Sequence, residues 1–215
     1  MFIDLHVHTR FSACSRLSLD EILEHAADRG LDGVCITDHH SVQALEQITP
    51  GLQPNGLRLF VGQEYSSDHG DFLIFGPRTA FPRGLTAQAL LAAVAQAGGA
   101  AVAAHPFRPQ CPVSEFIVRD KLCRIVETIN GRNSPAANQS VTQWLRQHDL
   151  IECAGSDAHT LEELGKVRTR FHKAINSTAD LVHALNNGLC VPHVNGIAGE
   201  KVYQNQRKIL IPSIP

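Results

Sequence analysis

Asp4-Leu5-His6-Val7-His8-Thr9, near the start of the chain, is the stretch around which the predicted fold is organised. It continues a short apolar run, 1–3, and we interpret the two together as a strand. Side chains at positions i and i+2 of a strand point to the same face, so His6 and His8 lie side by side. Two such imidazoles at a strand end can bind one divalent metal ion. The pair is a weak indication alone and gains weight only if further ligands follow other strands.

Further histidines and carboxylates do accompany other predicted strands. These are Asp38, His39 and His40 after 33–37; Glu64 after 57–62; Asp71 just before 72–75; His105 after 100–104; and Asp157 and His159 after 151–154. Each group alone also fits a solvated turn or a helix cap. Together they favour one shared site.

Helices alternate with these strands. Ser18 and Glu21 form a predicted capping box, with Gly30 as the stop of that helix, and further helices are predicted over 86–97, 136–148 and 177–187. This alternation predicts an α/β fold with mostly parallel strands and helical crossovers. Six or seven strands in this length favour a small barrel over an open sheet. In such barrels the chemistry sits at the carboxyl ends of the strands.

Composition fits a single globular domain covering residues 1–215, with the part after about residue 190 structurally uncertain. The chain has 43% hydrophobic and 19% charged residues, and twelve histidines against two tyrosines and one tryptophan. A formal net charge of −2 predicts no extended nucleic-acid surface. Six scattered cysteines and no signal peptide predict reduced thiols and a cytoplasmic protein, and no apolar segment is long enough for a membrane span.

The residue types also indicate the chemistry. A histidine and carboxylate set without thiolates favours zinc, manganese or iron, and carboxylates suit bridging between two or three ions. Arginine matches phosphate oxygens well, and Arg10, Arg108 and Arg132 lie within a few residues of ligand-bearing strand ends. Cys14 follows the first histidines; we expect a structural role for it, with a weak metal contact as the alternative.

The chain closely resembles the PHP (polymerase and histidinol phosphatase) family of metal-dependent phosphoesterases. The matching motifs are Asp4-Leu-His-Val-His8, Ile36-Thr-Asp-His39, Glu64, His105-Pro106 and Gly155-Ser-Asp-Ala-His159. The resemblance implies a distorted (β/α)7 barrel, two or three divalent metal ions and hydrolysis of phosphate esters. It implies as metal ligands His6, His8, Glu64, His105, Asp157 and His159, with His39 either a ligand or a nearby acid.

Two positions depart from the family pattern. Many members carry an aspartate shortly after the His-x-His pair, where this chain has Phe11-Ser12-Ala13-Cys14. Many also carry a histidine in the strand after the glutamate. There this chain offers Asp71 as a substitute ligand, with His69 as a competitor. We also count Asp38 among the candidate metal ligands.

The expected reaction is attack of a metal-activated water on phosphorus, with His39 or His40 as the general acid for the leaving group. The expected partner is a small anionic phosphorylated substrate: a phosphomonoester, a nucleotide or a short oligonucleotide. Two alternatives remain open. One is an amidohydrolase-type enzyme that cleaves carbon–nitrogen bonds, and the other is a non-catalytic binding module stabilised by metal.

Overall fold

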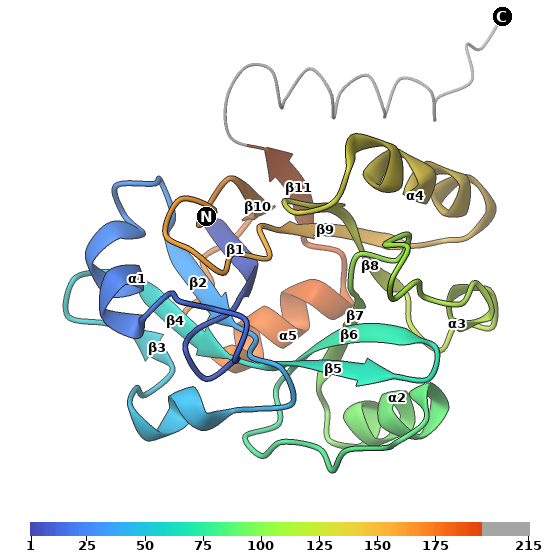
Figure 1. The fold of residues 1–215 in the computed structure, drawn as a ribbon, viewed down its shortest axis with the longest axis horizontal. Helices are drawn as coiled ribbons and strands as arrows, with labels where there is room; N and C mark the ends of the chain where they lie inside the picture. Colours follow the sequence, from blue (N-terminus) through green and yellow to red (C-terminus); the bar gives the residue numbers. More distant parts are fainter. Residues whose placement is uncertain (195–215) are drawn as a thin grey trace, which may run out of the picture.

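The computed structural model describes residues 1–194, and β1 (Phe2–Val7) lies at its centre (Figure 1). Every residue from 3 to 8 is 0% exposed. Burial on both faces explains why apolar residues dominate this strand and why each polar side chain in it needs a partner. The two histidines are therefore held inside the molecule from the outset.

The strands form two sheets. In spatial order, the first contains β11 (Cys190–Val194), β10 (Val167–Phe171), β1, β2 (Gly33–Ile36), β4 (Arg58–Val61) and β3 (Gly51–Leu52). The second contains β5 (Gln63–Ser67), β6 (Gly70–Phe75), β7 (Ala100–Ala103), β8 (Ile125–Asn130) and β9 (Ile151–Gly155).

The α/β class is confirmed, but the prediction of mostly parallel strands is wrong. Within residues 1–194, four strand pairs are parallel and five are antiparallel. Three of the antiparallel pairs have a visible origin: a short turn joins β5 to β6 as a hairpin, β10 runs back beside β1, and β11 pairs with β10. Tight connections allow only antiparallel neighbours.

A closed (β/α)7 barrel is not confirmed, because the strand pairing gives two separate mixed sheets. Two isolated parallel bridges join them, Val7 with Ala158 and His39 with Glu64. Both bridges lie at or just beyond the carboxyl ends of β1 and β2. The predicted ligands are therefore gathered along the junction of the two sheets.

The helices lie close to their predicted positions. They are α1 (Leu19–His25), α2 (Ala87–Gln96), α3 (Phe116–Arg119), α4 (Pro135–Gln147) and α5 (Thr178–Asn186), with a 3-10 turn η1 (Gln43–Glu46). The predicted capping box is present: the Glu21 N–H donates to Ser18 Oγ at 3.2 Å, and the Ser18 N–H donates to Glu21 Oε2 at 2.8 Å. The helix itself ends at His25, and turns continue to Gly30.

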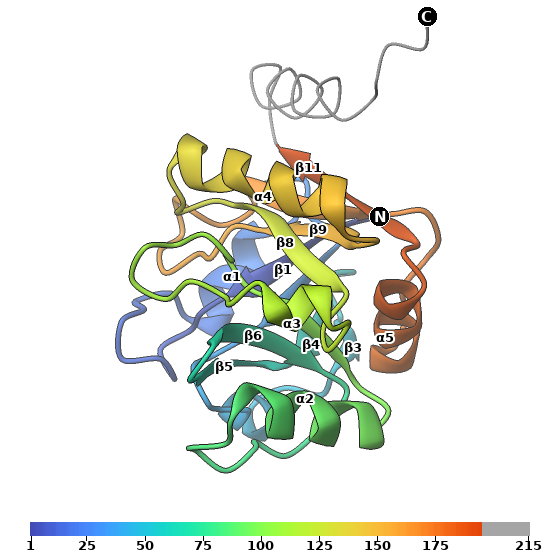
Figure 2. The same ribbon diagram turned by 90° about the vertical axis from the view of Figure 1, so that its right-hand side faces the viewer.

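Apolar side chains alternate between an inner core and two outer cores, as the two-residue period of a strand requires. In β6, Leu73 and Phe75 face the inner core with α5, whereas Phe72 and Ile74 pack outward with α2, α3 and α4. Figure 2 shows these three helices on one outer side of the second sheet. A third core lies between α1 and the outer face of β2 and β4.

The structure adds elements that the sequence patterns did not predict, namely α3, η1, β3, β5, β10 and β11. The part of the predicted domain after residue 194 lies outside the described residues. Within residues 1–194, every helix is too short or too polar to cross a membrane.

Candidate metal centre

His6 and His8 point their rings toward each other from the end of β1. Their Nε2 atoms lie 3.1 Å apart, and both side chains are fully buried. His6 Nδ1 is 3.0 Å from Glu127 Oε1, and His8 Nδ1 is 3.3 Å from Ser12 Oγ. One nitrogen of each ring is thus held by the protein, and the two Nε2 atoms face a common point.

Glu64 and Asp157 supply carboxylate oxygens at that point. Glu64 Oε2 is 3.4 Å from His6 Nε2 and 3.2 Å from His8 Nε2. Asp157 Oδ1 is 3.6 Å and 3.3 Å from the same two nitrogens. Two imidazole nitrogens and two carboxylate oxygens therefore surround a small volume, which is a donor set suited to a divalent ion.

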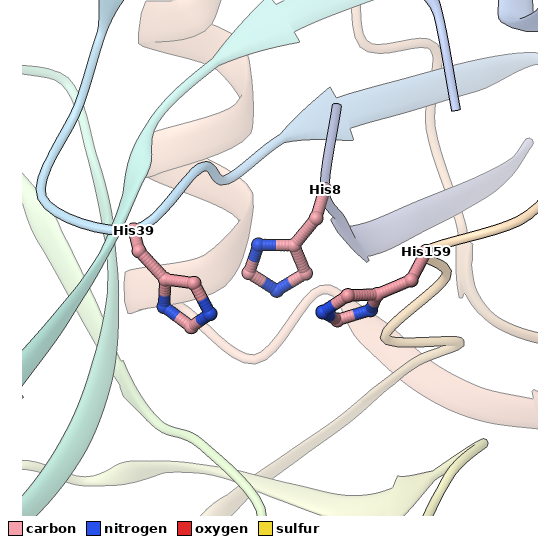
Figure 3. Close-up of side chains that lie close together, drawn as sticks. All are labelled: His8, His39 and His159. Carbon is pink, nitrogen blue, oxygen red and sulfur yellow. The ribbon is translucent and has the colours of Figure 1, made fainter. Parts of the chain in front are cut away.

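Three more histidines extend the site from other strand ends. His105 Nε2 is 2.9 Å from Glu64 Oε1, and His39 Nδ1 is 3.0 Å from Glu64 Oε2. The ring centre of His8 is 4.4 Å from those of both His39 and His159. Figure 3 shows the rings of His8, His39 and His159 converging from separate segments of the chain. The structure thus brings together all seven residues named by the resemblance.

The donor atoms form four overlapping groups within residues 1–194, each group with its atoms inside 4.8 Å of one another. They are His6, His8 and Asp157; His6, Glu64 and His105; His8, His39 and His159; and Asp71, His105 and Cys111. Shared members make the groups neighbours. The arrangement fits more than one ion with bridging ligands.

The charges of the inner site also suit a cation. Burial alone would lower the pKa of His6, but Asp157, Glu127 and Glu64 raise it well above its ordinary value. Burial alone would likewise raise the pKa of Glu64, but His6, His105 and His39 hold it well below its usual range. Three buried carboxylates therefore require positive charge beside them, which protons on histidines or metal ions can supply.

His159 has a different electrostatic environment. Burial, together with neighbouring His8, lowers the pKa of His159 to about 4. The ring is therefore neutral at pH 7, which is the form that binds metal. Its Nδ1 is 2.8 Å from the Asp157 carbonyl oxygen, which leaves Nε2 for the site.

Glu127 is a site residue that the sequence analysis missed. It lies in the middle of β8, is 1% exposed, and accepts the His105 N–H at 2.8 Å in addition to contacting His6. The Asn130 amide also donates to it at 3.0 Å. Its position within an apolar strand was the available signal, because a buried carboxylate must have partners.

Asp4 ties β1 to the segment that carries Asp157. Its carboxylate accepts hydrogen bonds from the Ser156 N–H, the Ser156 hydroxyl and the Gly165 N–H. Burial outweighs these bonds and raises the pKa of Asp4 to about 6. Gly155 permits the close approach, since a Cβ there would lie 2.5 Å from His6 Cβ and 2.9 Å from Glu127 Oε1.

Asp38 does not point into the site, contrary to its expected role as a ligand. Its carboxylate accepts the Thr9 N–H and the Thr9 hydroxyl at 2.7 Å each, and the Ser12 hydroxyl at 2.6 Å. These bonds engage both of its oxygens and fix the loop after β1. Asp38 therefore positions that loop instead of joining the candidate ligand groups of residues 1–194.

Asp71 and His69 are separated by the structure. Asp71 Oδ2 is 4.0 Å from His105 Nε2, whereas His69 contacts Ser114 Oγ at 3.1 Å and the ring of Phe116. Cys111 Sγ lies in one candidate group with Asp71 and His105, but burial raises the pKa of its thiol to about 12, which disfavours the thiolate form that binds metal. The other cysteine considered at the site, Cys14, is exposed and belongs to none of the groups found in residues 1–194.

The three predicted phosphate-binding arginines have different surroundings. Arg108 Nη2 donates to Asp157 Oδ2 at 2.7 Å and to Asn130 Oδ1 at 2.8 Å, so this side chain lies at the site. Arg132 follows β8, and its side chain is 43% exposed, 3.6 Å from Glu163. Arg10 contacts the Arg16 carbonyl and Glu21 instead of the ligands, because it turns toward the start of α1.

Backbone strain is concentrated at the site. Within residues 1–194, four residues other than glycine have a positive φ: His40 (50°), His105 (30°), Asp157 (57°) and Lys121 (59°). The first three belong to the site or its border. Such conformations cost free energy and persist where the surrounding structure imposes them, commonly at functional sites.

Comparison with known sequences gives weak but consistent matches. Residues 135–190 match the family model described as PHP-associated. An uncharacterized protein of Methanocaldococcus jannaschii is 26% identical over 179 residues, covering 80% of this chain and 70% of its own length. A second one from the same organism is 27% identical over 121 residues, covering 52% and 71%.

Solved structures share the fold. PsfC from Pseudomonas syringae superposes with a TM-score of 0.72 at 18% identity, covering 97% of both chains. A putative metal-dependent phosphoesterase from Bifidobacterium adolescentis gives 0.61 at 19% identity, covering 86% of this chain and 96% of that one. An amidohydrolase from Chromobacterium violaceum gives 0.64 at 16% identity, covering 91% and 99%.

Endonuclease Q, solved with a 27-mer duplex substrate that carries an abasic lesion, gives a TM-score of 0.67 at 17% identity, covering 86% of this chain and 56% of that one. This similarity contradicts the expected absence of an extended nucleic-acid surface, since a protein with the same fold binds a duplex. The expectation rested on net charge, which does not show how cations are distributed over the surface of a protein. The PHP-associated match over residues 135–190 and the shared fold agree with the family resemblance of the sequence motifs.

Proposed function

We propose that this protein is a metal-dependent hydrolase of phosphate esters that uses two or three divalent ions, with zinc, manganese and iron as candidates. The observation that carries the proposal is the position of Glu64. One of its oxygens contacts His6, His8 and His39, and the other contacts His105. A carboxylate between several imidazoles is the arrangement that bridges metal ions.

The proposed ligands divide into neighbouring positions. His6, His8 and Asp157 would hold one ion, and Glu64 with His105 would hold a second, beside Asp71. His8, His39 and His159 offer a third position toward the exposed side. What such ions supply when bound is a water of lowered pKa and positive charge beside the phosphoryl oxygens.

The protein's own groups would orient the ligands and the substrate. Glu127 fixes the ring of His6 by its bond to Nδ1, and Arg108 fixes Asp157. Arg108 is 22% exposed on its side chain, which supports contact with a phosphoryl oxygen from the open side.

His40 is the proposed proton donor to the leaving oxygen. Its Nδ1 is buried without a hydrogen-bond partner, and its ring borders the open side of the site. Burial, together with Arg83 and His39, lowers the pKa of His40, so the protonated ring would be a stronger acid that is populated mainly at acidic pH.

The two bridges between the sheets support the finer fold assignment as well. We propose that these bridges between strand ends hold the two sheets together as a distorted barrel around the site. The similarity to a phosphoesterase and to an endonuclease supports phosphate esters as the substrate class, with nucleic-acid strands among them.

A second candidate is hydrolysis of carbon–nitrogen bonds, which the similarity to an amidohydrolase favours. Amidohydrolase sites often use a carboxylated lysine as a bridging ligand. In this chain the carboxylate of Glu64 occupies the bridging position between the imidazoles. We therefore rank this candidate second.

The test combines metal analysis with a substrate screen. Purified protein is analysed for metals and then assayed, with each metal restored, on phosphomonoesters, phosphodiesters, oligonucleotides and amides. Two or three equivalents of metal with release from phosphate esters are expected. Release from amides alone would favour the second candidate, and bound metal without any turnover would favour a binding module. Protein that takes up no metal would overturn the proposal.

A further inference from the structure

A hollow of about 540 Å³ adjoins the metal centre on the side of His39. Three segments line it: the loop after β1 through Phe11, the turn from His39 to Glu46, and the connection between β6 and α2 through Arg78 and Arg83. In Figure 1 that connection runs below β5. His39 borders both the hollow and the candidate ligand groups, so whatever occupies the hollow is continuous with the site.

We propose that this hollow binds the backbone of a single nucleic-acid strand that continues from the scissile phosphate at the metal centre. The proposal rests on the proposed function and goes further, because it names the substrate class and the residues that select it.

The first support is charge. Arg78 and Arg83 are both exposed, and neither forms an ion pair within the described part of the chain. Other exposed arginines do have such partners, as Arg119 does with Asp120 and Arg124 with Asp149. The single carboxylate in the lining is that of Glu46. The hollow thus offers two cations not neutralised by the protein.

The second support is the pair of rings. Phe11 and His40 both line the hollow, and grooves for single strands combine such rings with cations because bases stack on them. His40 is held firmly, since its N–H donates to the Glu64 carbonyl at 2.8 Å and its ring meets that of Tyr65 at 4.6 Å.

The third support is that a nucleic-acid strand carries several phosphates, whereas a monoester carries one. A monoester carries its phosphate to the metal centre and leaves both arginines of the hollow without an anion. A strand places further phosphates along its length, so one substrate can engage the metal centre and the arginines together. Electrostatic contacts of this kind dominate the affinity of proteins for nucleic-acid backbones.

The test measures binding of a fluorescent single-stranded 12-mer with phosphorothioate linkages to the metal-loaded protein, at several salt concentrations. The probe variant is R78Q/R83Q. Its matched control is R119Q/R124Q, which removes the same charge from exposed, paired arginines. Each lost phosphate contact lowers the slope of log affinity against log salt by about 0.7. R78Q/R83Q should therefore bind more weakly with a slope reduced by about 1.4.

Each outcome decides the proposal. The expected result is a reduced slope in R78Q/R83Q and an unchanged slope in the control, with each single variant losing about half of the effect. Equally weakened strand binding in both double variants would mean that affinity depends only on the overall charge of the protein, and it would overturn the proposal. So would failure of the wild type to bind, or an equal dependence on both arginines for binding of a mononucleotide.

The proposed function and the proposed strand-binding site can be disproved independently of each other. If the wild type hydrolyses phosphate esters but its strand binding ignores Arg78 and Arg83, only the binding site is wrong. If strand binding depends on both arginines but no ester is hydrolysed with any metal, only the proposed function is wrong. Melting temperatures of all variants verify that each is folded.

Discussion

The metal centre has an inner part and an outer part that differ in how their side chains are held. Glu64, Asp157, Glu127 and His6 form the inner part, and each is at most 2% exposed with partners on several strands. The outer part contains His39, His40 and Arg132, which come from turns and are partly or largely exposed. The inner part is a buried cluster of imidazole and carboxylate groups. The outer part has room for substrate.

The largest effect is expected from a substitution in the inner part. In Glu64→Gln the shape is kept but the charge between four imidazoles is lost. We expect loss of bound metal and a fall in turnover of more than about 100-fold. This exceeds the effect of substituting a residue that only hydrogen-bonds to a metal ligand. Metal analysis and kinetics measure this, with Glu24→Gln on the exposed face of α1 as control. Full metal content and activity would contradict the role of Glu64.

The next effect tests the outer part. If His40 donates the proton, His40→Gln should slow hydrolysis of esters with alcohol leaving groups by about 100- to 10,000-fold. Nitrophenyl esters should be affected little, since nitrophenolate leaves without a proton. His172→Gln, at an exposed position remote in sequence, is the control. Equal losses on both kinds of ester would remove His40 from this role.

A smaller effect is expected at Glu127, and it distinguishes a role in metal affinity from a role in the reaction. Glu127→Gln loses the charge beside His6 Nδ1 while keeping a similar shape. We expect metal affinity to fall by about 10- to 100-fold, with most of the turnover restored at saturating metal. Titration of the metal-free variant measures the affinity. A loss of turnover that excess metal does not restore would assign Glu127 a part in the reaction itself.

The smallest effect concerns only the scaffold, at the capping box of α1. Hydrogen bonds from the Ser18 side chain and backbone lower the pKa of Glu21. A carboxyl group whose pKa is lower in the folded than in the unfolded protein stabilises the fold at pH values above its unfolded pKa. This contribution is lost as the pH falls through the folded pKa. Glu21→Gln should therefore melt slightly below the wild type at pH 7, and the difference should shrink as the pH falls below the ordinary pKa of a glutamate. A difference that persists in acid would contradict this origin.

The candidate ligands that lie at strand ends were more predictable from sequence than the other site residues. His6, His8, Glu64, His105 and Asp157 follow or end apolar strands, and strand ends are recognisable from the apolar runs before them. Glu127 was missed because it replaces an apolar residue within a strand, where only its burial reveals it. Asp38 was misassigned because sequence order does not show which way a side chain turns after a strand ends.

The sheets were harder to predict for a related reason. β5 reads Gln-Glu-Tyr-Ser-Ser and β10 reads Val-Arg-Thr-Arg-Phe, so neither has the apolar run that marked the other strands. Both pair in antiparallel fashion with neighbours whose positions depend on tertiary contacts. Local patterns therefore predicted the parallel strands and their helices but not the mixed topology.

The left-handed backbone at Asp157 limits how this position can vary. Among residues with side chains, asparagine and aspartate tolerate a φ of 57° better than most, and glycine adopts it freely. Glutamate would keep a carboxylate but add backbone strain, while asparagine would keep the backbone but lose the charge. Aspartate is thus the one residue that meets both requirements, so drift at this position is constrained by conformation as well as by chemistry.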